Sequence, residues 1–165
     1  MRVLLSGYNG TMGQVLKNYI QDSTDLEIVA GVGRELLDEE FPTYTSYEGL
    51  EKIADVIIDF SHHAGTEELV EYAKRTATKV VIATTGHTPE ELELIDELAT
   101  QVGVVYAGNY SLGVNVLVEL VKKASELLLG YDIEVIEKHH NKKVDAPSGT
   151  AKMLVDAVKD VEDYT

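Results

Sequence analysis

The densest group of ionisable side chains in this sequence lies in one short segment, residues 138–143. The segment contains three of the 14 Lys and Arg residues and two of the five histidines, in a chain whose formal net charge is −15. A local group of cations in an anionic protein favours a small anionic ligand. A histidine, with an unperturbed pKa of about 6.5, can also deliver a proton near neutral pH. The segment therefore indicates an anion site with an acid beside it.

A Ser-Gly-Thr turn at residues 148–150 follows closely and opens a predicted helix. Hydroxyl groups and free backbone N–H groups at the N-terminus of a helix suit a carboxylate. We therefore expect the two stretches to act together on an acidic small molecule.

Metal binding by the histidine pairs is disfavoured. His139 and His140 are adjacent, as are His62 and His63. Neighbouring side chains on a strand point to opposite faces, so one ion cannot easily take both. No H-x-x-x-H spacing or acidic cluster completes a site, and a chain without cysteine has no thiolate ligands and no disulfides. We expect no metal.

A glycine-rich turn near the N-terminus is the second feature with chemical meaning. Its glycines lie between an apolar run and a helical pattern. Glycines there let the backbone approach a pyrophosphate while the free N–H groups of the helix face the anion. The spacing is one residue looser than G-x-G-x-x-G, so a turn without a ligand is the alternative. The expected cofactor-binding residues of the turn are Gly7, Asn9, Gly10, Thr11, Met12 and Gly13.

Apolar runs predict the elements that hold this turn. Five short, partly β-branched runs are typical of buried strands, and helical periodicity separates them. The expected strands are residues 2–6, 26–32, 55–60, 79–84 and 103–107, and the expected helices are residues 11–21, 64–75 and one that starts at 88–91. Strands and helices that alternate in this way imply a doubly wound, Rossmann-like α/β fold with a parallel sheet.

Further cofactor contacts are expected at the carboxyl edge of that sheet, where ligands of open α/β sheets lie. Small and polar residues follow the third, fourth and fifth strands. The expected contacts are Phe60, Ser61, Thr84, Thr85, Gly86, Ala107, Asn109 and Tyr110. Ordinary turn chemistry and helix capping are the alternative for each of them.

The end of the second strand carries the expected choice between the two nicotinamide cofactors. An acid at this point binds the ribose hydroxyls, whereas an Arg accepts a 2′-phosphate. Arg34 favours NADPH, and Glu35 leaves NADH open. A solvated Arg34 without a role in binding is the alternative.

Residues after the fifth strand follow a different pattern. A long helix is predicted over 114–129, a strand over 131–137 and a further helix from 148 to 161. We place a domain boundary inside the long helix, which gives domains 1–118 and 119–165. A lone strand cannot satisfy its backbone groups, so we expect that the chain is truncated or that another subunit completes it.

Composition and charge exclude several classes of protein. A net charge of −15 would repel nucleic acids and anionic lipid surfaces. Residues 1–7 do not have the pattern of a signal peptide, and no apolar run approaches the roughly 18 residues of a membrane span. We expect a cytoplasmic protein.

Taken together, these motifs resemble the dihydrodipicolinate reductase family of lysine and diaminopimelate biosynthesis. The longest match joins Glu137, the two histidines and Lys143 to the stretch that runs from Asp145 to Ala151. The matching segments are residues 7–13, 58–61, 84–86, 109–111 and 137–151, in the order of the family. The resemblance covers the whole chain.

The resemblance implies reduction of 4-hydroxy-tetrahydrodipicolinate, or of the dihydrodipicolinate formed from it, to tetrahydrodipicolinate with NADPH or NADH. By position it implies that His139 is the proton donor and that Lys143 binds a substrate carboxylate and supports protonation. It also implies a homotetramer and an α+β substrate-binding and tetramerisation domain that begins near residue 119. The residues that would hold the dicarboxylate are His140, Ser148, Gly149 and Thr150.

Two departures from the family leave alternatives open. Gly33 stands where many members have the ribose-binding acid, which leaves the cofactor preference open. Members also continue with more strands of the second domain, so we expect weak or absent turnover from these 165 residues alone. The alternatives are a non-catalytic NAD(P)-binding fragment and a related dehydrogenase that acts on another amino-acid-derived substrate.

Overall fold

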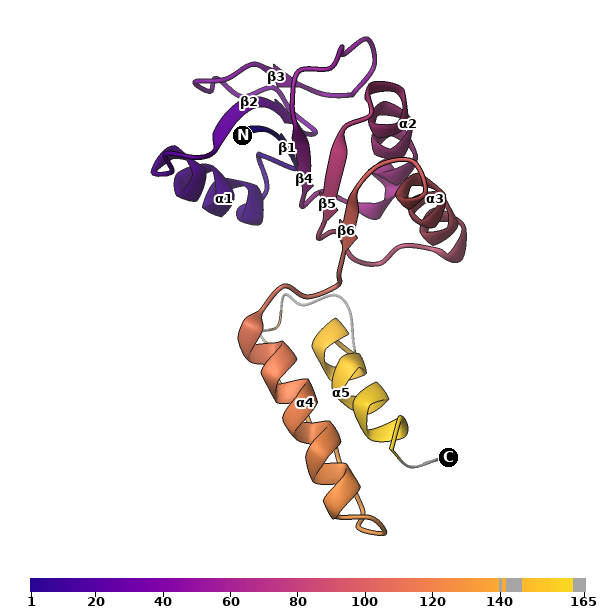
Figure 1. The fold of residues 1–165 in the computed structure, drawn as a ribbon. Helices are drawn as coiled ribbons and strands as arrows, with labels where there is room; N and C mark the ends of the chain where they lie inside the picture. The colour runs from indigo at the N-terminus through magenta and orange to yellow at the C-terminus, as the bar shows by residue number, and fades with distance from the viewer. Residues whose placement is uncertain (140, 142–146, 162–165) are drawn as a thin grey trace. The chain divides into compact units, whose positions relative to one another are not determined.

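The computed structural model describes residues 1–139, 141 and 147–161. Contacts divide the chain into two compact units, Met1–Ala107 and Gly108–Thr165. The first unit is built on a six-stranded sheet in the order β3-β2-β1-β4-β5-β6, in which every neighbouring pair is parallel (Figure 1). Its strands are β1 (Arg2–Ser6), β2 (Glu27–Val32), β3 (Thr43–Tyr44), β4 (Val56–Asp59), β5 (Lys79–Ile82) and β6 (Val104–Tyr106). The expected doubly wound α/β fold is confirmed for this unit.

Helices cover both faces of the sheet. The helical elements of the first unit are α1 (Thr11–Gln21), the 3-10 turn η1 (His63–Gly65), α2 (Thr66–Thr76) and α3 (Pro89–Ala99). Alternate strand residues point to opposite faces. Leu4 therefore packs with Leu69 of α2 and Leu98 of α3, whereas Val3 packs with Ile20 of α1. All four of these leucine and isoleucine side chains are at most 2% exposed.

The five predicted strands are confirmed, and one strand was not predicted. β3 is only two residues long and lies in a connection that reads as polar, so no periodicity marks it. It pairs with β2 at the sheet edge through the register Gly31 to Thr43 and Val32 to Tyr44. This short strand matters because the chain that follows it turns back toward the end of β1.

The start of α3 shows how the sequence sets a helix boundary. Thr88 accepts a hydrogen bond from the Glu91 backbone N–H, and the Glu91 carboxylate accepts one from the Thr88 N–H at 2.7 Å. Pro89 occupies the first turn, where its missing N–H costs nothing. Such a capping box satisfies two donors that the helix itself leaves free.

The described part of the second unit contains two helices, α4 (Leu112–Leu127) and α5 (Gly149–Lys159). The helices pack side by side, with Lys122 Nζ 3.3 Å from Asp160 Oδ2 (Figure 1). The division between the units falls at Ala107 and Gly108, whereas the boundary expected at residues 118 and 119 lies inside α4. All of α4 falls in the second unit, where it packs against α5.

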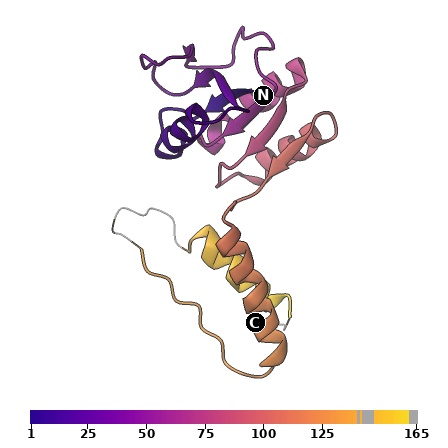
Figure 2. The ribbon, with the colours of Figure 1, turned by 60° about the vertical axis from the view of Figure 1, so that its left-hand side comes forward.

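The strand predicted over residues 131–137 is wrong for the described chain. Figure 2 shows this stretch as extended chain without a strand, and none of its residues pairs with the sheet. Alternating polarity places side chains on two faces, but a strand also needs a partner for its backbone groups. Within the described residues no helix is long and apolar enough to cross a bilayer.

Candidate functional site

The glycine turn is shaped by backbone contacts that exclude side chains. Gly7 has φ +75°, a conformation that favours glycine, and a Cβ there would lie 2.4 Å from the Phe60 carbonyl oxygen. A Cβ on Gly13 would lie 2.2 Å from the Gly7 carbonyl oxygen. The Gly10 N–H donates to the Gly7 carbonyl at 2.9 Å and closes the turn. The sequence therefore needs glycine at positions 7 and 13 to bring the start of α1 against the sheet.

Free backbone donors lie at the end of this turn. Gly10 is the N-cap of α1 and has no side chain to accept a hydrogen bond from the first N–H groups of the helix. The first turn of α1 also has no acidic residue, so its positive end is not compensated locally. These donors suit a phosphate group.

A cavity of about 570 Å³ opens beside the turn. Its walls come from the carboxyl ends of β1, β2 and β4 and from the start of α2. The cavity brings together six of the predicted cofactor-binding residues, namely Gly7, Asn9, Gly10, Arg34, Phe60 and Ser61. Three more, Thr11, Met12 and Gly13, form the first turn of α1 directly after Gly10.

Several residues of the cavity wall were not predicted from the sequence. Thr45 and Tyr47 follow β3, and Glu68 lies in α2. The Glu68 carboxylate accepts a hydrogen bond from the Tyr47 backbone N–H at 2.5 Å, which holds the chain after β3 against α2. Burial raises the pKa of the Tyr47 phenol, so this group is neutral at physiological pH. No spacing signal marks these residues, because Thr45 and Tyr47 come to the turn only through the return of the chain at β3 and Glu68 only through the packing of α2.

A buried polar chain joins the ends of β4 and β5. The Thr84 hydroxyl donates to Asp59 Oδ2 at 2.6 Å and accepts from the Ser61 backbone N–H at 2.9 Å. Asp59 is 3% exposed and Thr84 is 5% exposed. The chain fixes Ser61 and Thr84 relative to each other, while Thr85 and Gly86 after them are exposed. The predicted edge residues of β4 and β5 are therefore adjacent, as parallel strands require.

A second link ties the same two loops together. His63 Nδ1 lies 3.0 Å from both carboxylate oxygens of Glu91, the residue that caps α3. The Thr88 backbone hydrogen bond and the nearby His63 lower the pKa of Glu91, so it remains an anion. His63 is thereby engaged by a carboxylate, and no group of three or more His, Asp or Glu side chains within the described chain is arranged to hold a metal ion.

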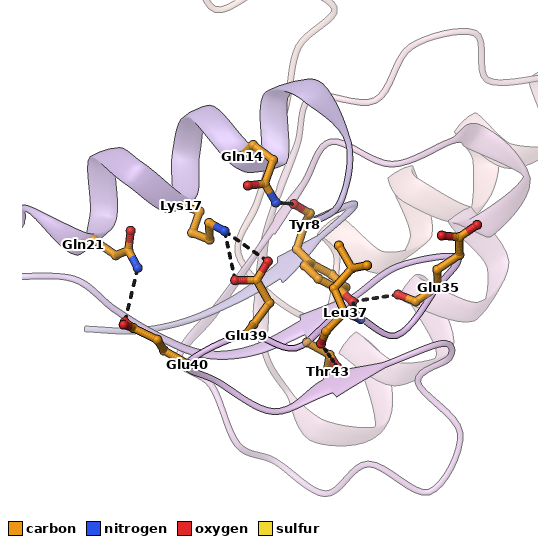
Figure 3. A network of polar contacts seen from close by, with 9 residues as sticks. All are labelled: Tyr8, Gln14, Lys17, Gln21, Glu35, Leu37, Glu39, Glu40 and Thr43. Carbon is orange, nitrogen blue, oxygen red and sulfur yellow. Dashed lines mark hydrogen bonds and ion pairs between the residues drawn. The ribbon is translucent and has the colours of Figure 1, made fainter.

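Arg34 and Glu35 follow β2 and have different surroundings. Arg34 lines the cavity, whereas Glu35 does not. The Glu35 backbone carbonyl accepts a hydrogen bond from the Tyr8 hydroxyl at 2.7 Å (Figure 3). A Cβ on Gly33 would lie 2.6 Å from Asn9 Oδ1 and 2.8 Å from the Tyr8 ring, so an acidic side chain does not fit at that position.

The remaining predicted edge residues are divided between the units. Ala107 ends the first unit and donates its N–H to the Ile82 carbonyl at 3.3 Å. Asn109 and Tyr110 belong to the second unit, where Asn109 Oδ1 accepts from the Ser111 N–H at 2.9 Å. Ser111 is the N-cap of α4, so this Asn109 contact belongs to the start of that helix.

The predicted catalytic segment is partly described. Glu137 Oε1 accepts from the Ser148 backbone N–H at 2.9 Å, and Glu137 Oε2 lies 3.6 Å from His139 Nδ1. Ser148 is the N-cap of α5, and its hydroxyl accepts from the Ala151 N–H at 3.1 Å. Glu137 therefore brings His139 to the turn that carries Ser148, Gly149 and Thr150. His140 and Lys143 lie outside the described residues.

Glu137 was not among the residues predicted for the site, although it begins the matching motif. Its carboxylate faces an imidazole nitrogen, and 26% of its side chain is exposed, against 39% for His139. A carboxylate at one ring nitrogen orients an imidazole. The signal available in the sequence was the position of Glu137, two residues before the histidine.

These features define the first unit as a Rossmann-like nucleotide-binding domain, with its glycine turn at the first βα connection and a cavity at the carboxyl edge. Residues 1–110 match the family model described as dihydrodipicolinate reductase, N-terminus, and residues 113–164 match the corresponding C-terminus model. The chain belongs to the dihydrodipicolinate reductase family. The expected resemblance is thus confirmed.

Individual relatives agree with this assignment. The chain is 44% identical over 161 residues to a 4-hydroxy-tetrahydrodipicolinate reductase of Caldanaerobacter subterraneus subsp. tengcongensis, covering 98% of this chain and 64% of the relative. It is 40% identical over 162 residues to the reductase of the same name from Clostridium tetani, covering 97% of this chain and 64% of the relative. The chain therefore spans slightly less than two thirds of the length of these relatives.

A solved structure gives the same result for the fold. Dipicolinate-bound dihydrodipicolinate reductase from Paenisporosarcina sp. TG-14 superposes with a TM-score of 0.80 at 26% identity. The match covers 100% of this chain and 68% of that chain.

Proposed function

We propose that this chain contributes the cofactor site and the proton donor of an NAD(P)H-dependent reductase that converts 4-hydroxy-tetrahydrodipicolinate, or dihydrodipicolinate, to tetrahydrodipicolinate. The observation that carries the proposal is the cavity at the glycine turn, in a chain that belongs to the dihydrodipicolinate reductase family. The names of the relatives and the second unit's His139 and Glu137 pair support the choice of substrate.

The residues at the turn fit a dinucleotide. A Cβ on Gly7 or Gly13 would collide with backbone of the chain itself, so glycine at these positions lets the start of α1 lie close to the end of β1. The first N–H groups of α1 follow Gly10, which lines the cavity. Gly7, Asn9, Gly10 and the first turn of α1 would hold the pyrophosphate. The nicotinamide cofactor supplies a hydride when bound. Thr84, Thr85 and Gly86 would contribute contacts from the end of β5.

The second unit would bind the dicarboxylate and supply the proton. In the proposal His139 donates a proton to the substrate, and Glu137 orients the ring through Nδ1. Ser148, Gly149 and Thr150 offer a hydroxyl cap and helix N–H groups to one carboxylate. His140 and Lys143 complete the proposal as cationic partners of the substrate.

Turnover with freshly generated 4-hydroxy-tetrahydrodipicolinate tests the reaction, followed as NADPH or NADH oxidation. We expect His139→Ala and Lys143→Ala to lower kcat by about 100-fold, within the range for loss of general acid catalysis. Lys152→Ala changes an exposed lysine of α5 and serves as the matched control. Cofactor binding measured by fluorescence should persist in all three variants.

Two results would contradict the proposal. If both His139→Ala and Lys143→Ala keep wild-type turnover, these two residues do not take part in the reaction. Cofactor binding without substrate-dependent oxidation, in a chain of confirmed mass, would instead favour the non-catalytic NAD(P)-binding alternative.

We propose NADPH as the preferred cofactor because Arg34 lines the cavity and Gly33 leaves no acid at the ribose position. The Arg34 guanidinium makes no hydrogen bond or ion pair within the part of the chain that the structure describes, so it can bind a phosphate bidentately. Arg34→Ala should weaken NADPH binding about tenfold or more and change NADH binding little. Equal losses for both cofactors would contradict this preference.

We also propose a cytoplasmic homo-oligomer, with the tetramer as the expected form. Large apolar side chains of α4 are exposed in the single chain, with Leu112 at 78%, Leu120 at 62% and Leu127 at 73%. Burying such side chains against another protein surface is favourable. Light scattering after size-exclusion chromatography tests the assembly, and a monomeric mass would contradict it.

A further inference from the structure

Tyr8 belongs to the glycine turn in sequence, but its side chain is directed into the protein. It is fully buried, and its ring lies against the edge of Phe41 with a centroid distance of 6.0 Å. A Cβ on Gly31 or Gly33 would lie 2.8 Å from a ring atom of Tyr8. Gly31 of β2 and Gly33 directly after the strand thus leave the space that the Tyr8 ring fills.

The Tyr8 hydroxyl holds the chain directly after Arg34. It donates to the Glu35 backbone carbonyl at 2.7 Å and accepts from the Leu37 backbone N–H at 2.9 Å. Figure 3 shows the hydroxyl reaching the segment from below α1. The segment has no helix or strand between β2 and β3, so these two bonds set its course where it leaves β2.

Other contacts hold the same segment at its far end. Lys17 of α1 binds both carboxylate oxygens of Glu39 at 3.1 and 2.9 Å, and Gln21 reaches Glu40 at 3.3 Å (Figure 3). The Lys17 and Glu39 side chains are only 16% and 12% exposed. These contacts lie five and six residues beyond Arg34. Nearer to the arginine, the Gly33 N–H donates to the Tyr44 carbonyl at 3.0 Å and the Thr43 hydroxyl donates to the Leu37 carbonyl at 3.1 Å. Tyr8 is the side chain that binds the residue directly after Arg34.

We propose that Tyr8 is a positioning residue for Arg34 and thereby sets the preference of the site for a 2′-phosphate over a free ribose hydroxyl. The Arg34 side chain is exposed and makes no bond of its own within the described chain, so only its backbone determines where the guanidinium can reach. This inference rests on the proposed NADPH preference.

The physical reason is the geometry of phosphate binding by arginine. A bidentate contact requires the planar guanidinium to meet two oxygens at once, so a mobile backbone weakens it strongly. In the proposed site the pyrophosphate would be held by the backbone of the glycine turn and the first turn of α1, and Tyr8→Phe changes only a side chain that points away from the cavity. The loss of the Tyr8 hydroxyl should therefore affect one phosphate and leave the remainder of the binding site intact.

Tyr8→Phe tests this inference, because it removes the hydroxyl and keeps the ring that fills the space above Gly31 and Gly33. Glu35 and Leu37 are exposed, so water can replace the lost partner and the fold should survive. Tyr72→Phe is the matched control, since it also removes a tyrosine hydroxyl that donates to a backbone carbonyl, that of Glu51 at 3.1 Å.

The measurement is the affinity of the full chain for adenosine 2′,5′-bisphosphate and for AMP by calorimetry. We expect Tyr8→Phe to weaken the bisphosphate about 5- to 10-fold and AMP less than about 2-fold, as expected for loss of a hydrogen-bonded anchor. Tyr72→Phe should leave both affinities unchanged. Lys17→Met releases the far end of the segment. It should change the ratio of the two affinities less than Tyr8→Phe does.

The outcomes separate this inference from the proposed cofactor preference. An Arg34→Ala variant that keeps the wild-type ratio would overturn the preference itself and the role of Tyr8 with it. If the preference for the bisphosphate over AMP falls in Arg34→Ala but keeps its wild-type value in Tyr8→Phe, only the positioning role of Tyr8 is overturned. The positioning role would also be overturned if Tyr8→Phe weakened the binding of both probes equally. The same holds if Lys17→Met changed the affinity ratio as much as Tyr8→Phe.

Discussion

The two units of this chain hold their proposed functional residues by different means. Residues of the first unit are positioned by a parallel sheet whose core includes Leu4, Ile57 and Val80, each at most 1% exposed. The described part of the second unit buries little beyond Ala151, Ala157 and Val158, while Leu120 and Leu127 are more than 60% exposed. The glycine turn is therefore built into a packed core, and His139 is held mainly by local polar contacts.

This difference predicts which kind of substitution each proposed site tolerates. Close packing leaves no room for added atoms, so the cofactor site should fail when volume is added. The His139 site depends on one carboxylate and a helix cap, so it should respond to loss of charge and tolerate changes in volume. Each of the following variants compares the units directly.

The largest effect should come from an added methyl group in the turn. A Cβ on Gly13 would lie 2.2 Å from a carbonyl oxygen, so Gly13→Ala must displace the backbone. We expect a loss of about 3 kcal/mol or more in unfolding free energy and no measurable cofactor binding. Chemical denaturation and cofactor fluorescence measure the two effects.

Gly113→Ala is the control from the second unit. The nearest atom to its Cβ is Ser111 Oγ at 3.8 Å, and the position is helical. The change should be neutral or slightly stabilising. Similar losses for the two variants would mean that the units do not differ in packing as described.

Removing core volume should give the next largest effect. Leu98→Ala removes a fully buried side chain of α3 and should cost about 2–5 kcal/mol, whereas Leu120→Ala in the monomeric chain should cost less than about 0.5 kcal/mol. Denaturant unfolding measures both. If Leu120→Ala is as costly as Leu98→Ala and also lowers the oligomer mass, α4 is covered by another chain in the assembly. The difference in packing between the units then holds only for the single chain.

Loss of the Glu137 charge should affect only the proposed proton transfer in the second unit and not the cofactor site of the first. Glu137→Gln weakens the contacts to His139 and to the Ser148 N–H, so kcat should fall about tenfold with unchanged cofactor affinity. Glu134→Gln alters an exposed carboxylate three residues away and should have no effect. A Glu137→Gln enzyme with normal kcat would show that His139 does not need this partner.

The smallest effect should appear as a pH dependence of the first unit. Burial lowers the pKa of His87, whose Nδ1 lies 3.4 Å from the Tyr106 hydroxyl. The unfolded chain then binds the proton more readily, so this histidine favours folding above its ordinary value of 6.5 and opposes it as pH falls below that value. His87→Gln should flatten the loss of stability between about pH 6.5 and 5.

Glu91 gives a comparison for that assignment. Glu91 has a pKa lowered by its Thr88 and His63 contacts, so its contribution is lost only as pH falls below its ordinary value of 4.5. A decline between pH 6.5 and 5 that persists in His87→Gln would assign the effect to another group.

Much of the first unit could be predicted from the sequence because local periodicity and glycine chemistry determine it. The runs at residues 2–6 and 11–21 correspond to β1 and α1 to the residue. Arg34, Phe60 and Ser61 were predicted by their positions after strands, and all three line one cavity with Gly7. Parallel strands end at one edge, so order along the chain is enough to gather such residues.

The tertiary structure alone decided which residues complete that cavity and which elements form at all. Thr45 and Tyr47 reach it through the two-residue strand β3, which has no sequence pattern, and Glu68 reaches it from the first turn of α2. The alternation at residues 131–137 is equally visible in the sequence but forms no strand, because backbone hydrogen bonds need a partner that alternation does not supply. Tyr8 shows the same principle: its place in the turn is local, whereas its bonds to Glu35 and Leu37 cross about 30 residues of chain and exist only once β1 and β2 have paired.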